Sequence, residues 1–342
     1  MTRKPDQGAG NMKVATFNIE NLDYAQEPGN TSFQERLVPL RQMLKRINAD
    51  ILCLQEVHSQ KNTENKKTLE ALTELVEGTQ YQDYHVQYTT TQDGQPRAER
   101  NLVVLSKFTF SDPEPAQYNA DLITDLMYRS VTSNPVEPNA SKLKWERPIL
   151  HCQIAHPELG NIHIINLHLK SRLASVIKGK KVDRYTWASP AAWGEGYFLS
   201  SIKRVGQALE TRILLDTIFD GTDENEADPQ AKIIVCGDLN AEPGEVPVET
   251  ICGSVDNTNN AALRYKSLVP CSAGLAESVR YSHFHHGKGN LLDHMLISQS
   301  LLPYFDGAKI LNETLHDESL PYRKDEKYPA SDHAPFIALF RD

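Results

Sequence analysis

Short apolar runs of strand length recur along almost the whole chain, and they constrain its fold more than any other feature. The runs are VATFNIE, DILCLQEV, NLVVLS, ILHCQIA, IHIINLHL, IIVCGDLN, LDHMLIS and APFIALF. Helix-like segments lie between some of them, at residues 33–47 and 201–219, where apolar side chains recur at helical spacing. Because the strands are continuously apolar, both faces of a sheet must be covered. The pattern predicts a mixed α/β fold in which two sheets stack face to face and helices cover the outside.

The composition supports a folded protein with a sizeable core. Of its 342 residues, 39% are hydrophobic and 24% are charged. The formal net charge of −9 excludes a uniformly basic surface, but it allows a local basic patch or an acidic cleft that a metal covers. No apolar run approaches the length of a membrane span, and the five cysteines form no C-x-x-C pair. We therefore expect a cytoplasmic protein with reduced thiols.

Three irregular stretches interrupt the regular pattern, at residues 112–146, 172–200 and 241–288. Stretches of this length usually hold functional loops or small added elements. We predict a disordered or extended tail at residues 1–11 and a single domain at residues 12–342. Within this domain, residues 172–204 form an insertion that is rich in basic and aromatic side chains.

The strand-like runs repeatedly end in polar side chains that suit metal and phosphate chemistry. These residues are Asn18, Glu20, Glu56, His168, Asp238, Asn240, Asp293, Asp332 and His333. Carboxylates are hard oxygen ligands for Mg²⁺, amides can hold a phosphate oxygen or a water, and histidines can move protons near neutral pH. Any one of these residues could be structural, as a helix cap or part of an Asx turn. Their ordered co-occurrence favours a catalytic site.

The ordered motifs FNIENL, LQEV, INLHLKS, GDLNAEPGE, LLDHMLIS and SDHAPF resemble the endonuclease/exonuclease/phosphatase superfamily. This superfamily has the DNase I-like fold and includes sphingomyelinases, inositol polyphosphate phosphatases and deadenylases. The resemblance spans residues 13–340, and GD-x-N together with a C-terminal SDH is its most specific part. It implies a four-layer α/β sandwich, with two stacked mixed β-sheets flanked by helices and the active site at one edge of the sheets. It also implies a metal-dependent hydrolase of phosphoester bonds.

The resemblance assigns metal-binding roles to four residues. Glu56 matches the metal-binding glutamate, Asn18 contacts metal or phosphate, Asp332 lies close to the metal, and Glu20 stands where relatives often carry an acidic residue. The implied cofactor is Mg²⁺, and Mn²⁺ is expected to substitute for it.

The resemblance also implies how the ester bond is hydrolysed. Asp238 and Asn240 occupy the GD-x-N positions, which orient or deprotonate the attacking water and contact the scissile phosphate. His333 matches the catalytic histidine, and Asp293 matches the carboxylate that orients it. Metal, imidazolium and amide groups would stabilise charge on the phosphoryl oxygens while a positioned base activates water for in-line attack. Ser331 is expected only to shape the turn through its hydroxyl.

His168 argues against abasic-site endonucleases, which generally lack a histidine at this position. In DNase I-like members the histidine pairs with a glutamate one strand earlier, and Glu99 falls where that partner would be. A polar residue before a strand is also common surface decoration. Arg147 resembles an arginine that reaches a substrate phosphate, although it could be an ordinary edge-strand residue. Lys170, from INLHLKS, is a further candidate for substrate binding.

The insertion at residues 172–204 holds seven basic and two acidic residues, with five aromatic residues interleaved. Its candidate substrate-binding residues are Arg172, Trp187 and Trp193. Basic groups that follow a phosphate backbone, and aromatic faces on which bases stack, are what a nucleic-acid grip requires. The same composition could bind an anionic lipid surface or pack as a structural lid. Of the three, we favour nucleic acid.

The sequence thus predicts a Mg²⁺-dependent nuclease that hydrolyses phosphodiester bonds in DNA or RNA. The alternative is a phosphomonoesterase or phospholipid phosphodiesterase, acting on inositol phosphates or sphingomyelin, because the same kind of site cleaves those esters. A binding protein with a degenerate site is disfavoured, since none of the central residues is replaced. The cluster of His283, His285 and His286 lacks the spacing of a structural zinc site, and we interpret His285 and His286 as loop residues near the cleft.

Overall fold

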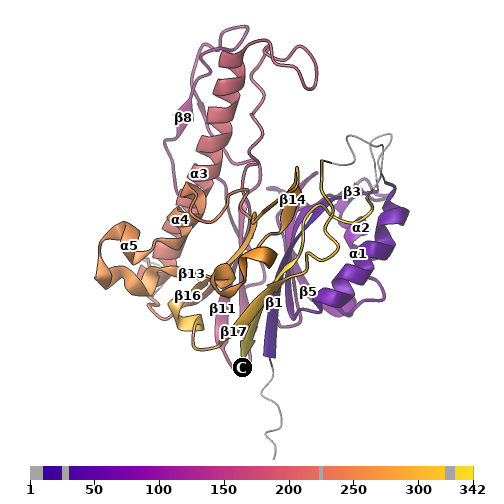
Figure 1. Cartoon of the computed structure of the whole chain (residues 1–342), viewed down its shortest axis with the longest axis vertical. Helices are drawn as coiled ribbons and strands as arrows, with labels where there is room; N and C mark the ends of the chain where they lie inside the picture. The colour runs from indigo at the N-terminus through magenta and orange to yellow at the C-terminus, as the bar shows by residue number, and fades with distance from the viewer. Residues whose placement is uncertain (1–10, 25–30, 223–225, 320–327, 342) are drawn as a thin grey trace, which may run out of the picture.

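Two six-stranded sheets packed face to face form the centre of the molecule (Figure 1). The computed structural model describes residues 11–24, 31–222, 226–319 and 328–341. The first sheet has the order β17 (Phe305–Ile310), β18 (Phe336–Arg341), β1 (Asn11–Leu22), β2 (Ile51–Val57), β6 (Asn101–Ser106) and β5 (His85–Tyr88). The second has the order β13 (Leu268–Pro270), β16 (Asp293–Ser298), β12 (Lys232–Asp238), β11 (Gly160–His168), β10 (Ile149–His156) and β7 (Ala116–Tyr118). All eight apolar runs noted in the sequence form strands of these two sheets.

Each sheet contains one parallel pair of strands, and these pairs decide where the polar strand ends meet. β1 lies parallel to β2 in the first sheet, and β11 lies parallel to β12 in the second. The remaining pairings within the two sheets are antiparallel. Because parallel strands end at the same sheet edge, each pair delivers two sets of C-terminal side chains to one place.

Helices cover the outer faces of both sheets and complete four layers. α1 (Phe33–Ile47) and α2 (Glu70–Val76) pack on the first sheet, and α3 (Pro190–Asp220) and α4 (Val246–Cys252) pack on the second. The short α5 (Val255–Thr258) follows α4. This arrangement confirms the expected four-layer α/β sandwich.

The first helix forms with the bounds that its apolar periodicity predicts. It begins at a capping box, in which the Ser32 hydroxyl accepts from the backbone N–H of Glu35 and the Glu35 carboxylate accepts from the backbone N–H of Ser32. It ends at Asn48, whose left-handed backbone closes the last turn.

Three apolar layers hold these elements together. The inner layer, between the sheets, includes Cys53, Cys236 and Phe340, while two outer layers lie between each sheet and its helices. Successive strand side chains point to opposite faces, so both faces of each sheet are buried. This explains why the strands are continuously apolar, and each fully buried aliphatic side chain contributes about 1.5–3 kcal/mol.

Short elements occupy the connections. Three two-stranded ribbons pair β3 (Gln60–Lys61) with β4 (Lys67–Thr68), β8 (Met127–Tyr128) with β9 (Ser141–Lys142), and β14 (His283–His285) with β15 (Lys288–Asn290). The 3₁₀ helices are η1 (Gln80–Asp83), η2 (Ala261–Lys266), η3 (Cys271–Gly274), η4 (Glu277–Val279) and η5 (Gln299–Leu301). The stretches 112–146 and 241–288 therefore contain small added elements, as expected.

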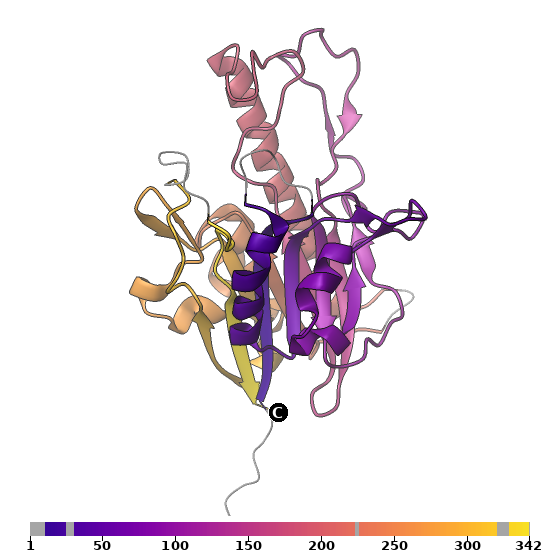
Figure 2. The same cartoon turned by 90° about the vertical axis from the view of Figure 1, so that its right-hand side faces the viewer.

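The upper half of α3 stands clear of the sheets and, with the loops beside it, forms an arm (Figures 1 and 2). We define the arm as residues 124–143 and 172–204. Here one expectation was wrong, because α3 begins at Pro190 and not at residue 201, so residues 172–200 are not irregular throughout. Ser189 caps the helix through its hydroxyl, and Pro190 follows at the first position. Apolar periodicity missed this half because it has no sheet to pack on and carries no single apolar stripe.

Two carboxylates of α3 hold the loops of the arm and its base. Glu195 accepts hydrogen bonds from the backbone N–H groups of Val131 and Thr132 and from the Tyr128 hydroxyl. Burial raises the pKa of Glu195, but hydrogen bonds from the side chains of Thr132 and Ser130, together with those from Val131 and Tyr128, outweigh it and lower the pKa to about 2. Near the base, the buried Glu210 accepts from the backbone N–H groups of residues 120–122 and from the Trp145 indole.

The five cysteines are free and buried in the structure, as expected for reduced thiols. Residues 1–10 of the predicted tail lie outside the described residues, and Asn11 is the first residue of β1. No helix among the described residues is long and apolar enough to span a membrane.

Candidate active site

The C-terminal ends of β1 and β12 meet although they belong to different sheets. The Asn18 side-chain amide donates to Asp238 Oδ2 at 3.1 Å, across 220 positions of the chain, and both residues are buried. Gly237 permits the close approach of β12 to β11, because a Cβ at this position would lie 1.9 Å from the Leu167 carbonyl oxygen. The predicted polar residues are therefore gathered at one edge of the sandwich.

Asp238 is the centre of this network. Its Oδ1 accepts from the backbone N–H of Asn240 at 2.9 Å, and its Oδ2 accepts from the Asn240 amide at 3.0 Å as well as from Asn18. Burial raises the pKa of Asp238 to about 6, with the positive charge of His333 opposing this shift and the negative charge of Asp293 adding to it. Asp238 is thus ionised near neutral pH and is basic enough to accept a proton.

His333 lies opposite Asp238 and is held by Asp293. His333 Nδ1 is 2.6 Å from Asp293 Oδ2, and His333 Nε2 is 3.9 Å from Asp238 Oδ2. Burial by itself lowers the pKa of His333, but the carboxylates of Asp293, Asp238 and Asp332 outweigh it and raise the pKa well above its usual value. The imidazole is therefore charged and donates through Nε2. The Ser282 hydroxyl accepts from the backbone N–H of Asp293 at 2.9 Å and fixes that strand end.

Ser331 links the SDH segment to the first strand. Its hydroxyl donates to the Asn18 carbonyl oxygen at 2.7 Å and accepts from the backbone N–H of His333 at 3.1 Å. This supports the expectation that Ser331 shapes the turn, and it adds a contact across 313 positions that the sequence did not reveal.

Glu20, Glu56 and Asp332 form the oxygen-rich side of the site. Glu20 Oε2 accepts from the backbone N–H of Asp332 at 3.2 Å, and Glu56 Oε2 accepts from the backbone N–H of Asn21 at 3.0 Å. Glu20, Asn21 and Glu56 have φ values of 54°, 45° and 65°, a left-handed conformation that is costly for such residues and recurs at functional sites. These residues lie in the last part of β1 and β2, where the pairing register of the two strands shifts.

The chemistry of this set fits a divalent cation. Burial raises the pKa of Asp332, and burial together with the charge of Asp332 raises that of Glu20, so the carboxylates repel one another without a cation. Asp332 Oδ1 is shielded from solvent and has no hydrogen-bond partner within the described ranges. Hard, mutually repelling oxygens with an unused acceptor suit Mg²⁺ or Mn²⁺.

Arg36 of α1 is a supporting residue that the sequence did not reveal. Its buried guanidinium donates to the carbonyl oxygens of Ile19, at 2.7 Å, and Glu20, at 2.6 Å. A further contact of 4.0 Å joins the Arg36 guanidinium to the Glu20 carboxylate. Arg36 thus holds the strained end of β1. Only its position in the first turn of a covering helix could have suggested this role from the sequence.

His168 lies between Glu56 and Asp238, and this corrects the pairing expected from the sequence. Its Nε2 is 3.5 Å from Glu56 Oε1 and 3.4 Å from Asp238 Oδ2. Glu99 is exposed, and His168 Nδ1 has no hydrogen-bond partner in the part of the chain that the structure describes. The expected Glu99–His168 pair is therefore not formed, because Glu99 lies in the exposed connection before β6. Burial, aided by Arg147, lowers the pKa of His168 well below its usual value and keeps the ring neutral.

Three cations lie close enough to His168 for their charges to act on it: Arg147, Arg100 and Lys170. Arg147 is buried and donates to the Leu169 carbonyl oxygen at 3.3 Å, while its Nε is shielded without a partner among the described residues. Lys170 Nζ is 3.8 Å from a Glu146 oxygen. Arg100 was not singled out from the sequence, yet its charge acts on His168, Arg147 and Lys170. Arg100 directly precedes β6, whose first residue pairs with Val57 at the C-terminal end of β2, and its place just before a strand-like run is the signal that could have found it.

The three candidates in the insertion lie in different settings. Arg172 donates to the Asn240 carbonyl oxygen at 3.2 Å and pairs with Glu245 at 2.6 Å, so it braces the GD-x-N loop. Trp187 is half-buried beneath Lys181, whose Nζ lies 4.6 Å from the ring centre. Trp193 is 48% exposed on α3 and stacks on Tyr197 at 5.4 Å.

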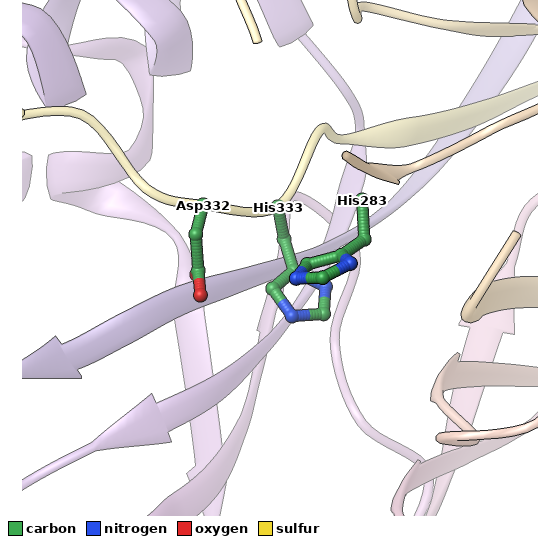
Figure 3. A group of neighbouring side chains, drawn as sticks. All are labelled: His283, Asp332 and His333. Carbon is green, nitrogen blue, oxygen red and sulfur yellow. The ribbon is translucent and has the colours of Figure 1, made fainter. Parts of the chain in front are cut away.

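The histidine cluster also reaches the site. His283 forms an isolated bridge with His333, and their ring centres lie 5.2 Å apart (Figure 3). His285 is the last residue of β14 and not a loop residue, its Nδ1 lies 3.0 Å from Glu318, and His286 occupies the turn that leaves β14. His294 lies apart from these residues, where its Nε2 contacts the Ala241 carbonyl oxygen at 2.8 Å.

Comparison with known proteins gives one family and one fold. Residues 15–333 match the model of the Endonuclease/Exonuclease/phosphatase family. None of the curated proteins matches the chain in sequence. The fold is similar to that of truncated Caenorhabditis elegans TDP2, with 17% identity, a TM-score of 0.55, and 97% of this chain and 98% of that chain covered.

Two further solved structures share the fold. An endonuclease/exonuclease/phosphatase family protein from Bacteroides thetaiotaomicron has 16% identity and a TM-score of 0.57, with 97% of this chain and 95% of that chain covered. A humanized D. rerio TDP2 with 14 mutations has 14% identity and a TM-score of 0.54, with 97% and 99% covered.

Proposed function

Because this chain belongs to the endonuclease/exonuclease/phosphatase family, whose members are metal-dependent hydrolases of phosphoester bonds, we propose that it is a nuclease. Its proposed substrate is a phosphodiester bond of DNA or RNA, and its proposed cofactor is Mg²⁺, with Mn²⁺ able to substitute. One observation carries the reaction type: the charged His333 and the ionised Asp238 face each other at 3.9 Å where the strands of both sheets end. We also propose a cytoplasmic location, which the five free, buried thiols support.

The division of labour follows from the charges and hydrogen bonds of the site. Asp238 accepts the proton of the attacking water, while Asn18 and Asn240 hold its carboxylate in place. His333, oriented by Asp293, donates to an oxygen of the phosphate as negative charge develops there. No covalent enzyme intermediate is required.

Glu20, Glu56 and Asp332 would hold the divalent ion, which when bound supplies positive charge to a phosphoryl oxygen. Arg147 and Lys170 lie beside neutral His168 and would bind the remaining negative charge of the substrate.

The arm supports a polymeric nucleic-acid substrate. Lys178, Lys180, Lys181 and Arg184 lie in its loops, and the stacked pair of Trp193 and Tyr197 is exposed on α3. The arm rises from the second sheet, beyond the edge where the active-site strands end (Figure 2). Cations along a backbone and open aromatic faces are the features that bind single-stranded nucleic acid.

A phospholipid phosphodiesterase is the second candidate, and a specific observation favours it. Many exposed large hydrophobic side chains of the described residues lie on the arm: Met127, Val131, Val136, Leu173, Val176, Val182, Tyr185, Trp193, Tyr197 and Phe198. Aliphatic groups of this kind bind a lipid surface better than they bind bases.

A substrate panel distinguishes the candidates. The protein is incubated with plasmid DNA, single-stranded DNA, RNA, inositol phosphates and sphingomyelin vesicles, each with Mg²⁺ or with EDTA, and His333→Ala serves as the inactive control. Mg²⁺-dependent cleavage of a nucleic acid is the expected result. Turnover of inositol phosphates or sphingomyelin alone would show that the nuclease assignment is wrong.

A further inference from the structure

Three side chains on the outer side of the active site are arranged as ligands for a metal. His283, Asp332 and His333 each offer one ligand atom, and these atoms all lie within 4.8 Å of one another. Figure 3 shows the imidazole of His283 beside that of His333, with the Asp332 carboxylate next to them. The bridge between His283 and His333 holds the two backbones together, so the grouping does not depend on flexible loops.

The hydrogen bonds of these residues leave coordinating atoms unused. His333 Nδ1 is taken by Asp293, which leaves Nε2, and His283 Nε2 lies 3.0 Å from Glu318, while His283 Nδ1 is shielded and has no partner among the described residues. Asp332 Oδ1 is likewise shielded and unpartnered there. A carboxylate on one nitrogen of an imidazole is the arrangement that orients metal-binding histidines.

The chemistry of this set differs from that of the proposed Mg²⁺ site. Two imidazoles, one carboxylate and an open position match three-ligand zinc sites, whereas Mg²⁺ prefers oxygen ligands in octahedral geometry. Two of the three ligands, Asp332 and His333, also belong to the proposed catalytic site. An ion bound here would therefore occupy groups that the reaction needs.

We propose that His283, Asp332 and His333 form an inhibitory site for Zn²⁺. An ion that binds His333 Nε2 displaces its proton to solvent and so removes the donor that the phosphate requires, and an ion at Asp332 weakens the binding of Mg²⁺. His283 takes no part in turnover and serves only the inhibitory site. The inhibitory role rests on the proposed hydrolase function, whereas binding of the ion does not.

The binding test uses the full-length protein freed of metal. Co²⁺ serves as a spectroscopic probe of imidazole ligation, and Zn²⁺ binding is titrated calorimetrically with Mg²⁺ in excess. His283→Ala is compared with the matched control His286→Asn, because His286 lies in the next turn with a left-handed φ of 51° that Asn tolerates. We expect His283→Ala to weaken Zn²⁺ binding by about tenfold or more and His286→Asn to leave it unchanged. Equal Zn²⁺ affinity in the wild type and His283→Ala, with both folded by circular dichroism, would overturn the site.

The inhibition test measures hydrolysis of the best panel substrate against Zn²⁺ concentration at fixed Mg²⁺. The Zn²⁺ concentration for half inhibition should rise by about tenfold in His283→Ala, while turnover without Zn²⁺ stays near that of the wild type. Equal inhibition of both proteins would overturn the inhibitory role. If the wild type binds Zn²⁺ through His283 but hydrolyses no panel substrate, the proposed function fails while the site stands.

Discussion

At the scale of single residues, Asp238 and His333 show how burial and charge act against each other. Burial disfavours the ionised form of Asp238, and the adjacent imidazolium limits that effect. The same carboxylates that surround His333 keep it charged although it is largely buried. Each group thus has the protonation state that its proposed role requires, at some cost to the folded state.

Substitution of either residue should separate activity from stability. We expect His333→Ala and Asp238→Ala to reduce turnover by about a thousandfold or more, because each removes a proton acceptor or donor in the reaction. The fold should persist, since the raised pKa of Asp238 shows that its charge opposes folding. Steady-state kinetics and circular dichroism measure both, and the exposed His85→Ala on β5 is the control. Near-normal turnover in His333→Ala would contradict the mechanism.

The carboxylates of the site predict stabilisation by metal. Glu20 and Asp332 repel each other in the folded state, so a bound Mg²⁺ should raise the unfolding temperature. Mg²⁺ at a hundred times its Kd would add about 2.7 kcal/mol to the free energy of unfolding. Thermal unfolding with Mg²⁺ and with EDTA measures this shift, and Glu56→Gln should reduce it. An equal shift in the variant would show that Glu56 does not bind the ion.

At the scale of elements, α3 serves two purposes in one helix. Its lower half packs on the second sheet, with Leu214, Leu215 and Phe219 buried. Its upper half contacts the loops of the arm, through hydrogen bonds of Glu195 to the backbone of Val131 and Thr132 and of Ser200 to the Leu173 carbonyl oxygen. The arm is therefore positioned by polar contacts and not by an apolar core, which leaves its aromatic faces open for a ligand.

Loss of the exposed aromatic rings of the arm should affect substrate binding and not the chemical step. Stacking contributes about 1–3 kcal/mol per base, so Trp193→Ala and Tyr197→Ala should each raise the KM for single-stranded nucleic acid about tenfold while kcat changes little. Leu302→Ala, which removes an exposed apolar side chain outside the arm, is the control. A fall in kcat at unchanged KM would show that these residues act in another way.

At the scale of the whole molecule, buried histidines make stability depend on pH. His151 and His163 contact each other at 2.9 Å on adjacent strands of the second sheet. Burial, aided by the charge of His163, lowers the pKa of His151 to about 3, and burial lowers that of His163. Protons therefore bind these histidines more tightly in the unfolded chain than in the folded protein. The contribution of the neutral pair to the free energy of unfolding is complete above pH 6.5 and is lost as the pH falls below that value.

A denaturation series tests this link. Between pH 7.5 and pH 5, His151, with its pKa lowered to about 3, should remove about 2 kcal/mol from the free energy of unfolding. His151→Gln should reduce the total loss by that amount, whereas His85→Gln, at an exposed position, should not. Urea unfolding at both pH values measures the difference, and an identical loss in the wild type and His151→Gln would contradict the prediction.

The local pattern of the sequence was enough to predict the sheets, one helix and the central residues of the site. Continuous apolar runs predicted the stacked sheets, helical spacing predicted the bounds of α1, and motif order led to Asn18, Asp238 and His333, which the structure brings together. These inferences succeed because strand and helix periods, and the polar residues that end them, are properties of consecutive residues.

Tertiary structure alone decided the contacts between distant segments. It placed Glu56 and Asp238 beside His168 and left Glu99 exposed, brought Arg36 to the end of β1, and set His283 against His333. It also extended α3 beyond the sheets, where no core imposes an apolar stripe. Such contacts depend on how two sheets and their helices pack, and packing joins side chains that no local period relates.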